Sequence, residues 1–325
     1  MLFRSYLRLI CPGSATRVIP GQMTALLRAK FGLNDVLGLN GEKNRNDHRH
    51  HAVDACVIGV TDQGLMQRFA QANAQARTSG LTRLVEEMPE PWATYREHVE
   101  RAVNHIWVSH KPDHGYEGAM MEETSYGIRR DGSIRQRKKA DGSAGREITN
   151  LIRVAESTQP SRHGVDAEGK PLPYKGYVGG SNYCLEITVN DKGKWEGQVI
   201  STFEAYFIAA QFVRDGCSQI QAQNKLRYFP TGQNGKPLAM RLVIGDCVCL
   251  DLDNYEQVLR VVKINGNNGQ VFMAPVNEAN VDARNTDKQD SFAYISKYAG
   301  SMQKAKARQV TISPIGELRD PGFQG

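Results

Sequence analysis

Three histidines and two aspartates lie within the eight residues from Asp47 to Asp54, directly before an apolar helical pattern. Apolar side chains then recur at helical spacing, at Val53, Cys56, Val57 and Val60. This spacing predicts an amphipathic helix that begins near His50 and runs on to about Ala76. Asp47 is placed to cap its first turn and to complement the helix dipole.

This cluster has the residue types that metal-dependent hydrolysis uses. On a helix, Asp54 shares a face with both His50, four residues earlier, and His51, three residues earlier. A carboxylate can hold a hard cation, and an imidazole can accept a proton from an attacking water. A solvated, His-rich first turn would show the same spacing. The pattern alone therefore leaves open whether the cluster is chemical and which histidine acts.

Composition sets broad limits on the chain. Its 325 residues are enough for two or three domains. The 41 basic and 35 acidic residues give a mildly positive net charge of +6. The six cysteines show no C-x-x-C pair and no zinc-like spacing with histidine, which favours a reducing compartment. We find no signal peptide and no apolar run near the ~20 residues that span a bilayer. We expect a cytoplasmic protein that does not contact membranes.

The remaining pattern predicts an α+β, multidomain chain. Near the N-terminus we expect helices at Gln22–Phe31 and Ala93–Ala102 and short strands at Arg17–Pro20 and Ile106–Pro112. The turn residues Asn190–Lys194 predict a hairpin between two of the strands given below, and a capping box at Ser201–Glu204 then opens a helix to about Arg214. The predicted strands of this β-rich part are Tyr183–Val189, Trp195–Thr202, Leu242–Ile244, Cys247–Leu252, Val258–Ile264, Gln270–Ala274 and Val310–Ile312.

Two basic clusters are candidate contacts for a nucleic-acid backbone. Six cations within eleven residues, opposed only by Asp131, are Arg129, Arg130, Arg135, Arg137, Lys138 and Lys139. A second set has no acidic residue among its members, Lys297, Lys304, Lys306 and Arg308. Such cations suit phosphates, whose contacts position a duplex without reading its sequence. For the first cluster, a solvated hairpin is the alternative.

The segment Asn46–Ala55 resembles the third RuvC motif, H-H-A-x-D-A, of type II CRISPR RNA-guided DNA endonucleases (the Cas9 effectors). The resemblance extends over essentially the whole chain, and Val108–Pro112 with Glu123–Thr124 resembles the segment that leads out of the nuclease domain in the compact type II-C branch. Around the motif it covers Val18–Gly21, Thr24–Arg28 and Val108–Pro112. Later segments resemble the wedge domain (Tyr183–Ala205) and the domain that reads the protospacer-adjacent motif, or PAM (Arg260–Asn265, Lys304–Arg308 and Ser313–Gly316).

This resemblance implies a partial RNase H-like (RuvC) α/β piece over residues 1–118, a wedge domain over 119–232 and a PAM-interacting domain over 233–325. It implies that His51 is the general base and that Asp54, with His51 beside it, lies at a two-metal Mg²⁺ site. His50 would then have a packing role. The implied reaction is hydrolysis of the displaced, non-target DNA strand.

The chain also departs from that family. It lacks the aspartate of the first RuvC strand, the glutamate of the second RuvC motif and the HNH domain. We therefore expect an incomplete metal site, and either a gene fragment or one half of a split protein. Alone, it is expected to cleave nothing.

The implied partners are guide RNA (crRNA and tracrRNA), target DNA with its PAM, and the missing N-terminal part of the same nuclease. Candidates for reading the PAM lie in one loop: Lys263, Asn265, Asn267, Asn268 and Gln270. Asn and Gln can pair bidentately with adenine, although the same sequence also suits an ordinary hairpin turn. Two other functions remain open: a guide-RNA and PAM-DNA binding module without catalysis, and a transposon-encoded RNase H-like RNA-guided nuclease.

Overall fold

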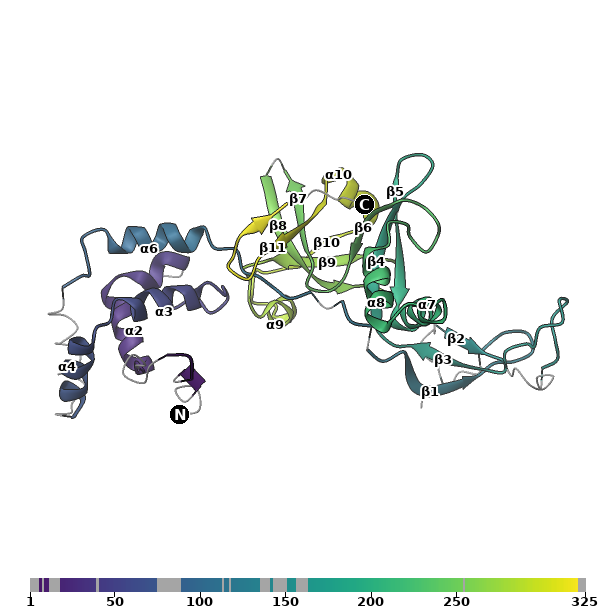
Figure 1. Ribbon diagram of the computed structural model, residues 1–325, viewed down its shortest axis with the longest axis horizontal. Coiled ribbons are helices and arrows are strands. Elements are labelled where there is room, and N and C mark those ends of the chain that lie inside the picture. Colours follow the sequence, from purple (N-terminus) through teal and green to yellow (C-terminus); the bar gives the residue numbers. More distant parts are fainter. Residues whose placement is uncertain are drawn as a thin grey trace. The chain divides into compact units, whose positions relative to one another are not determined.

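The computed structural model describes residues 6–7, 9–11, 18–38, 41–74, 89–112, 114–116, 118–134, 141–142, 151–155, 163–253 and 255–320. The chain forms two compact units (Figure 1). Unit 1 comprises Met1–Ser109, Asn277–Asp287 and Pro314–Glu317. Unit 2 comprises His110–Val276, Lys288–Ser313 and Leu318–Gly325.

Unit 1 is built from helices in its described residues. They are α2 (Gly21–Lys30), the 3-10 helix η1 (Leu33–Leu37), α3 (His50–Gly59), α4 (Gln63–Ala74), α6 (Tyr95–Asn104) and α9 (Val281–Thr286). Each of α2, α3 and α6 buries side chains at helical spacing in one core, including Met23 and Leu27, Val53 and Val57, and Val99 and Val103. The helices predicted at residues 22–31 and 93–102 are confirmed with small shifts of their ends.

The single long helix predicted from His50 to about Ala76 is wrong, because two helices occupy this range. α3 ends at Gly59, and the Thr61 hydroxyl donates a hydrogen bond to the Val57 carbonyl oxygen (2.8 Å). The Asp62 carboxylate then accepts the backbone N–H of Leu65 (2.6 Å) at the start of α4. This side chain satisfies an N–H that has no partner within the new helix, so the break is stabilised locally.

The two short strands predicted for unit 1 are also wrong. Residues 18–20 and 106–112 have no regular secondary structure, and Arg17, where the first predicted strand begins, lies outside the described residues. The peptide at Trp107–Val108 instead contacts loops: the Val108 N–H donates to the side chain of Asn277 (3.2 Å). β-branched and aromatic residues predict a strand only where a partner strand is available, and among the described residues these segments have none.

Unit 2 contains three antiparallel sheets. The first has the order β1-β3-β2 and the second the order β5-β4-β6, while six strands follow the order β10-β9-β8-β7-β11-β12. The strands are β1 (Met121–Gly127), β2 (Leu151–Val154), β3 (Lys175–Gly179), β4 (Asn182–Val189), β5 (Trp195–Ser201), β6 (Leu238–Leu242), β7 (Cys247–Leu252), β8 (Tyr255–Ile264), β9 (Val271–Pro275), β10 (Ile295–Lys297), β11 (Arg308–Ile312) and β12 (Leu318–Arg319). The helices are α7 (Thr202–Arg214), α8 (Gln219–Tyr228) and α10 (Ala299–Lys304).

One apolar core joins the second sheet to the six-stranded sheet. Leu185 of β4 and Met240 of β6 share it with Leu259 of β8, Met273 of β9 and Met302 of α10, and all five are at most 1% exposed. Removal of this apolar surface from water is the main force that stabilises unit 2. The predicted α+β, multidomain class is confirmed, while the predicted domain boundaries remain predictions.

Most local predictions for unit 2 are confirmed. β4 and β5 pair as an antiparallel hairpin, and Ser201 and Glu204 form both hydrogen bonds of the capping box that opens α7. The strand predicted at Leu242–Ile244 is wrong by a few residues, because β6 ends at Leu242 and the Val243 N–H donates to the Asp246 carboxylate in a turn (2.8 Å). No helix in the described part of the chain is long and apolar enough to cross a bilayer.

Candidate functional site

The start of α3 brings the predicted catalytic residues together. His50 and His51 lie in its first turn and Asp54 in the next. Asp47 does not cap the helix as predicted, because the N-cap position is Arg49. The Asp47 carboxylate instead accepts the Arg49 backbone N–H (2.8 Å) and pairs with the Arg49 guanidinium (2.7 Å).

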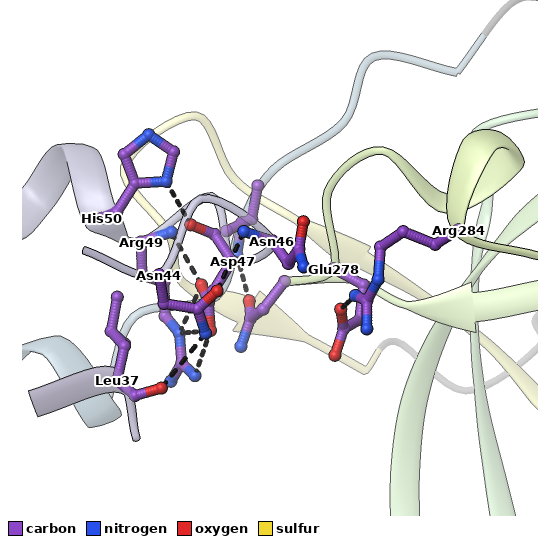
Figure 2. A network of polar contacts seen from close by, with 10 residues as sticks. Leu37, Asn44, Asn46, Asp47, Arg49, His50, Glu278 and Arg284 are labelled. Carbon is purple, nitrogen blue, oxygen red and sulfur yellow. Dashed lines mark hydrogen bonds and ion pairs between the residues drawn. The ribbon is translucent and has the colours of Figure 1, made fainter. Parts of the chain in front are cut away.

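A segment from much later in the chain holds the loop before α3 (Figure 2). The His48 N–H donates to the Asn277 carbonyl oxygen (2.9 Å), and the Ala279 N–H donates to the Asn46 carbonyl oxygen (2.8 Å). Between these bonds, Asp47 and Glu278 form an isolated antiparallel bridge. The first turn of α3 is therefore positioned by backbone contacts within unit 1 that no local pattern predicts.

Asp54 lies between two cations. Lys43 Nζ is 2.5 Å from its Oδ2, and Arg28 Nη1 is 2.5 Å from its Oδ1. Partial burial acts to raise the pKa of Asp54, but the hydrogen bonds and charges of Lys43 and Arg28 outweigh it and lower that pKa. Asp54 is therefore ionised at neutral pH, and both of its oxygens accept hydrogen bonds from side chains of unit 1.

The two histidines have different surroundings. His50 Nδ1 is 2.5 Å from the Asp47 carbonyl oxygen, so this nitrogen carries the proton that it donates. Burial lowers the pKa of His50, and the nearby His51 and Lys43 lower it further. The His51 ring lies 4.0 Å from the His50 ring, is exposed, and has no side-chain hydrogen bond to the described residues. Of the two imidazoles, His51 is the one available to solvent or a substrate.

The first basic cluster is described only in part. Arg129 and Arg130 are exposed at a tight turn that an Ile128–Ile134 bridge closes, and the Asp131 carboxylate accepts the Ser133 N–H there (2.9 Å). The chain therefore turns at Asp131–Gly132, and contact of this cluster with a nucleic-acid backbone remains a prediction. The other four cations lie outside the described residues: Arg135, Arg137, Lys138 and Lys139.

Two members of the second basic cluster form ion pairs with acidic residues from elsewhere in unit 2. Arg308 forms a bidentate ion pair with Glu256 of β8 (2.8 and 2.9 Å) and a second ion pair with Asp320. Lys306 pairs with Asp251 of β7 (3.1 Å), while Lys304 is exposed at the end of α10 and Lys297 is half-buried on β10. These acidic residues are distant in sequence, so the local charge count could not predict them.

The candidate PAM-reading loop is a turn between β8 and β9 in which several side chains already form hydrogen bonds. The Asn265 side-chain oxygen accepts the Asn267 N–H (3.0 Å), and that of Asn268 accepts the Gln270 N–H (3.1 Å). The Gln270 amide also lies 3.2 Å from the Ser296 hydroxyl. Lys263 and Asn267 are exposed, and base reading by this loop remains a prediction.

Residues 2–114 match the family model of RuvC endonuclease subdomain 3. This chain is related to part of the Cas9 endonucleases. The Cas9 of Campylobacter jejuni is 24% identical over 115 residues, which cover 32% of this chain and 11% of that protein. The Cas9 of Actinomyces naeslundii is 29% identical over 101 residues, which cover 29% of this chain and 9% of that protein.

Solved Cas9 structures share the fold of the chain. A crystal structure of Streptococcus thermophilus Cas9 in complex with AGGA PAM covers 100% of this chain at a TM-score of 0.54 and 13% identity. One of Campylobacter jejuni Cas9 in complex with sgRNA and target DNA (AGAAACC PAM) covers 98% at a TM-score of 0.51 and 14% identity. This chain spans 37% of each of those chains.

The relation to Cas9 nucleases implies a divalent metal near Asp54. Mg²⁺ prefers several oxygen ligands, and a two-metal site needs several carboxylates. The described residues contain no group of three or more His, Cys, Asp or Glu side chains that could hold a metal ion. The charges of Lys43 and Arg28 oppose a further cation at Asp54. The described residues of this chain therefore do not fit a two-metal site.

Sequence reasoning missed Arg28 and Lys43 as members of this site. A signal for Arg28 was present, because it lies outside the apolar stripe of α2 and so could point away from the core. Lys43 lies in the loop between η1 and α3, where no periodic pattern indicates the direction of its side chain. Loop residues of this kind can be assigned to a site only from tertiary contacts.

Proposed function

We propose that this chain is a portion of an RNA-guided CRISPR DNA endonuclease and carries the third RuvC segment. The observation that supports this proposal is the presence of His51 and Asp54 on adjacent turns of α3, within the residues that match RuvC endonuclease subdomain 3. In the complete nuclease, His51 would accept a proton from the attacking water. The proposed reaction is cleavage of the non-target DNA strand.

The chain alone is proposed to be inactive. In the complete nuclease, Asp54 would help to hold a divalent metal, which would supply charge stabilisation for phosphodiester hydrolysis. Asp54 is the carboxylate that this chain contributes, and Lys43 and Arg28 hold both of its oxygens. The remaining carboxylates would have to come from another part of the nuclease.

A cleavage assay tests this proposal directly. We expect the purified chain to leave a supercoiled plasmid intact in Mg²⁺ or Mn²⁺, with or without guide RNA. The Asp54→Asn variant, prepared in parallel, controls for contaminating nucleases, whose activity would be equal in both preparations. Metal-dependent nicking that the wild-type chain shows and Asp54→Asn lacks would contradict the proposed inactivity.

Unit 2 is proposed to bind guide RNA (crRNA and tracrRNA) and the PAM duplex. The support is its shared fold with a Cas9 whose structure was solved with sgRNA and target DNA, together with the exposed Arg129 and Arg130. The candidate backbone contacts remain the two basic clusters, and the candidate base contacts remain the loop between β8 and β9.

Substitution of the exposed arginines tests the backbone contacts. The double variant Arg129→Ala, Arg130→Ala is expected to lower affinity for guide RNA about equally across sequences, because phosphates carry no sequence information. The slope of log affinity against log salt should fall by roughly 0.7 to 0.9 for each lost contact. Titration by fluorescence anisotropy at several salt concentrations measures both quantities. Loss of affinity for only some sequences would contradict a backbone role, and Lys192→Ala, at an exposed turn, serves as the charge control.

The second candidate function is a guide-RNA and PAM-DNA binding module without catalysis. The ion pairs of Asp54 with Lys43 and Arg28 favour it, because they satisfy the carboxylate without a metal. Mixing the chain with a separately purified protein that carries the first two RuvC motifs and the HNH domain of a related Cas9 separates the candidates. Cleavage of the non-target strand that needs Asp54 supports the nuclease, while guide-RNA binding without such cleavage supports the module.

A further inference from the structure

Unit 2 contains a cleft that the proposed RuvC chemistry does not use. It has a volume of about 620 Å³ and lies where α7 ends and along α8. The two helices lie side by side (Figure 1). The lining residues are Asp215, Gly216, Cys217, Gln221, Asn224, Lys225, Tyr228, Phe229 and Pro230. Its volume falls within the range of cavities that take small-molecule ligands.

Aromatic rings and amides form much of this cleft. Tyr228 is 67% exposed and Phe229 is 43% exposed, although the Phe229 ring lies 6.4 Å from that of Phe212. The side chain of Asn224 forms no hydrogen bond with the described residues. Exposed ring faces beside an amide without a partner are the groups that stack on a nucleobase and bond to its edge.

Two cations lie beside these rings. The Arg227 guanidinium carbon is 4.9 Å from the centroid of the Tyr228 ring, and Lys225 Nζ is 5.4 Å from that of Phe212. Neither side chain forms an ion pair within the part of the chain that the structure describes, and α8 contains no acidic residue. Arg227 also acts on the buried Asp246 carboxylate. The two positive charges outnumber the one carboxylate that lines the cleft, Asp215, which already accepts a hydrogen bond from the Gln211 side chain (3.0 Å), so they can attract phosphates that flank a bound base.

We propose that this cleft takes one unstacked base of a single-stranded RNA segment, with the adjoining phosphates at Lys225 and Arg227. This rests on the proposed guide-RNA binding and names a site for it. Tyr228, the more exposed of the two rings, would stack on the base, and Asn224 would contact its edge. An apolar peptide would use the rings but would leave the cations and the amide without partners, so RNA is the better match to the rings, the amide and the two cations.

The test uses the full chain and a short oligouridylate with 2-aminopurine at a central position, whose fluorescence falls when it stacks on an aromatic ring. We expect quenching with the wild-type chain, and a loss of affinity of about 5- to 100-fold in Tyr228→Ala. Tyr228→Phe keeps the ring and should keep both quenching and affinity. Tyr206→Ala, which removes a 46% exposed ring of α7 outside the cleft, should also keep both. Circular dichroism checks the folding of each variant.

The outcomes distinguish the proposed base site from the proposed guide-RNA binding by unit 2. If the chain binds oligouridylate and a folded hairpin RNA but Tyr228→Ala changes neither affinity nor quenching, the cleft is not a base site, and guide-RNA binding stands. If the chain binds no RNA of either kind, both proposals are wrong. Quenching that disappears in Tyr228→Ala and remains in Tyr228→Phe and Tyr206→Ala supports the base site.

Discussion

Replacement of Arg241 by methionine is expected to lower the free energy of unfolding of unit 2 by about 3 to 5 kcal/mol. Arg241 of β6 pairs with Glu186 of β4 in the buried sheet, with Nη2 2.6 Å and Nε 3.1 Å from the same carboxylate oxygen. Glu186 is 2% exposed, so loss of its partner leaves a buried charge without compensation.

The same guanidinium also forms hydrogen bonds with backbone carbonyl oxygens at the end of α8. Arg241 Nη1 donates to the carbonyl oxygens of Arg227 (2.9 Å) and Phe229 (3.3 Å). The other Glu186 oxygen accepts the Gln233 N–H (2.7 Å). Carbonyls in the last turn of a helix have no intrahelical partner, so Arg241 satisfies groups that would otherwise lose hydrogen bonds. The variant therefore weakens both the sheet and the end of α8.

Urea unfolding followed by circular dichroism measures this effect. Lys236→Met is the matched control, because it breaks the exposed ion pair with Glu196 (2.9 Å) and should cost less than about 1 kcal/mol. The double variant Glu186→Met, Arg241→Met should recover part of the loss, since it removes both buried charges. Equal midpoints for Arg241→Met and Lys236→Met would show that the buried pair contributes little.

Asp54→Asn is expected to destabilise unit 1 by about 1 to 2 kcal/mol at neutral pH. The variant leaves Arg28 and Lys43, which are 12% and 21% exposed, without their anionic partner. Because the pKa of Asp54 is lowered on folding from its ordinary value of 3.8, its stabilising effect is complete above that value. The effect is then lost as the pH falls through the lower, folded pKa.

The difference between wild type and Asp54→Asn should therefore stay constant from pH 7 to about pH 5 and shrink below about pH 4. Urea midpoints at several pH values measure it, and Asp191→Asn, at an exposed turn, is the control carboxylate. A difference that grows at acid pH would contradict the assigned ion pairs. Addition of Mg²⁺ should leave the wild-type midpoint unchanged, since a ligand stabilises only a state that binds it.

Local signals in the sequence predicted most of the regular elements. The capping box at Ser201 and Glu204 and the turn residues Asn190–Lys194 specify their backbone within a few residues, and both are confirmed. The break between α3 and α4 also has a local signal, because Asp62 lies three residues before the N–H that it accepts. Periodicity across the break led to a single predicted helix, since the apolar spacing continues through it.

The sequence by itself determined that His51 and Asp54 lie on adjacent turns of a helix with an apolar face. That arrangement follows from residue spacing, because an α-helix repeats every 3.6 residues. Only the tertiary structure decided what surrounds them. Lys43 and Arg28 reach Asp54 from a loop and from another helix, and residues 277–279 hold the loop before α3. The acidic partners of Arg308 come from β8 and from Asp320 in the same way. Contacts between residues far apart in the chain depend on how the elements pack, and periodicity and local charge do not encode them.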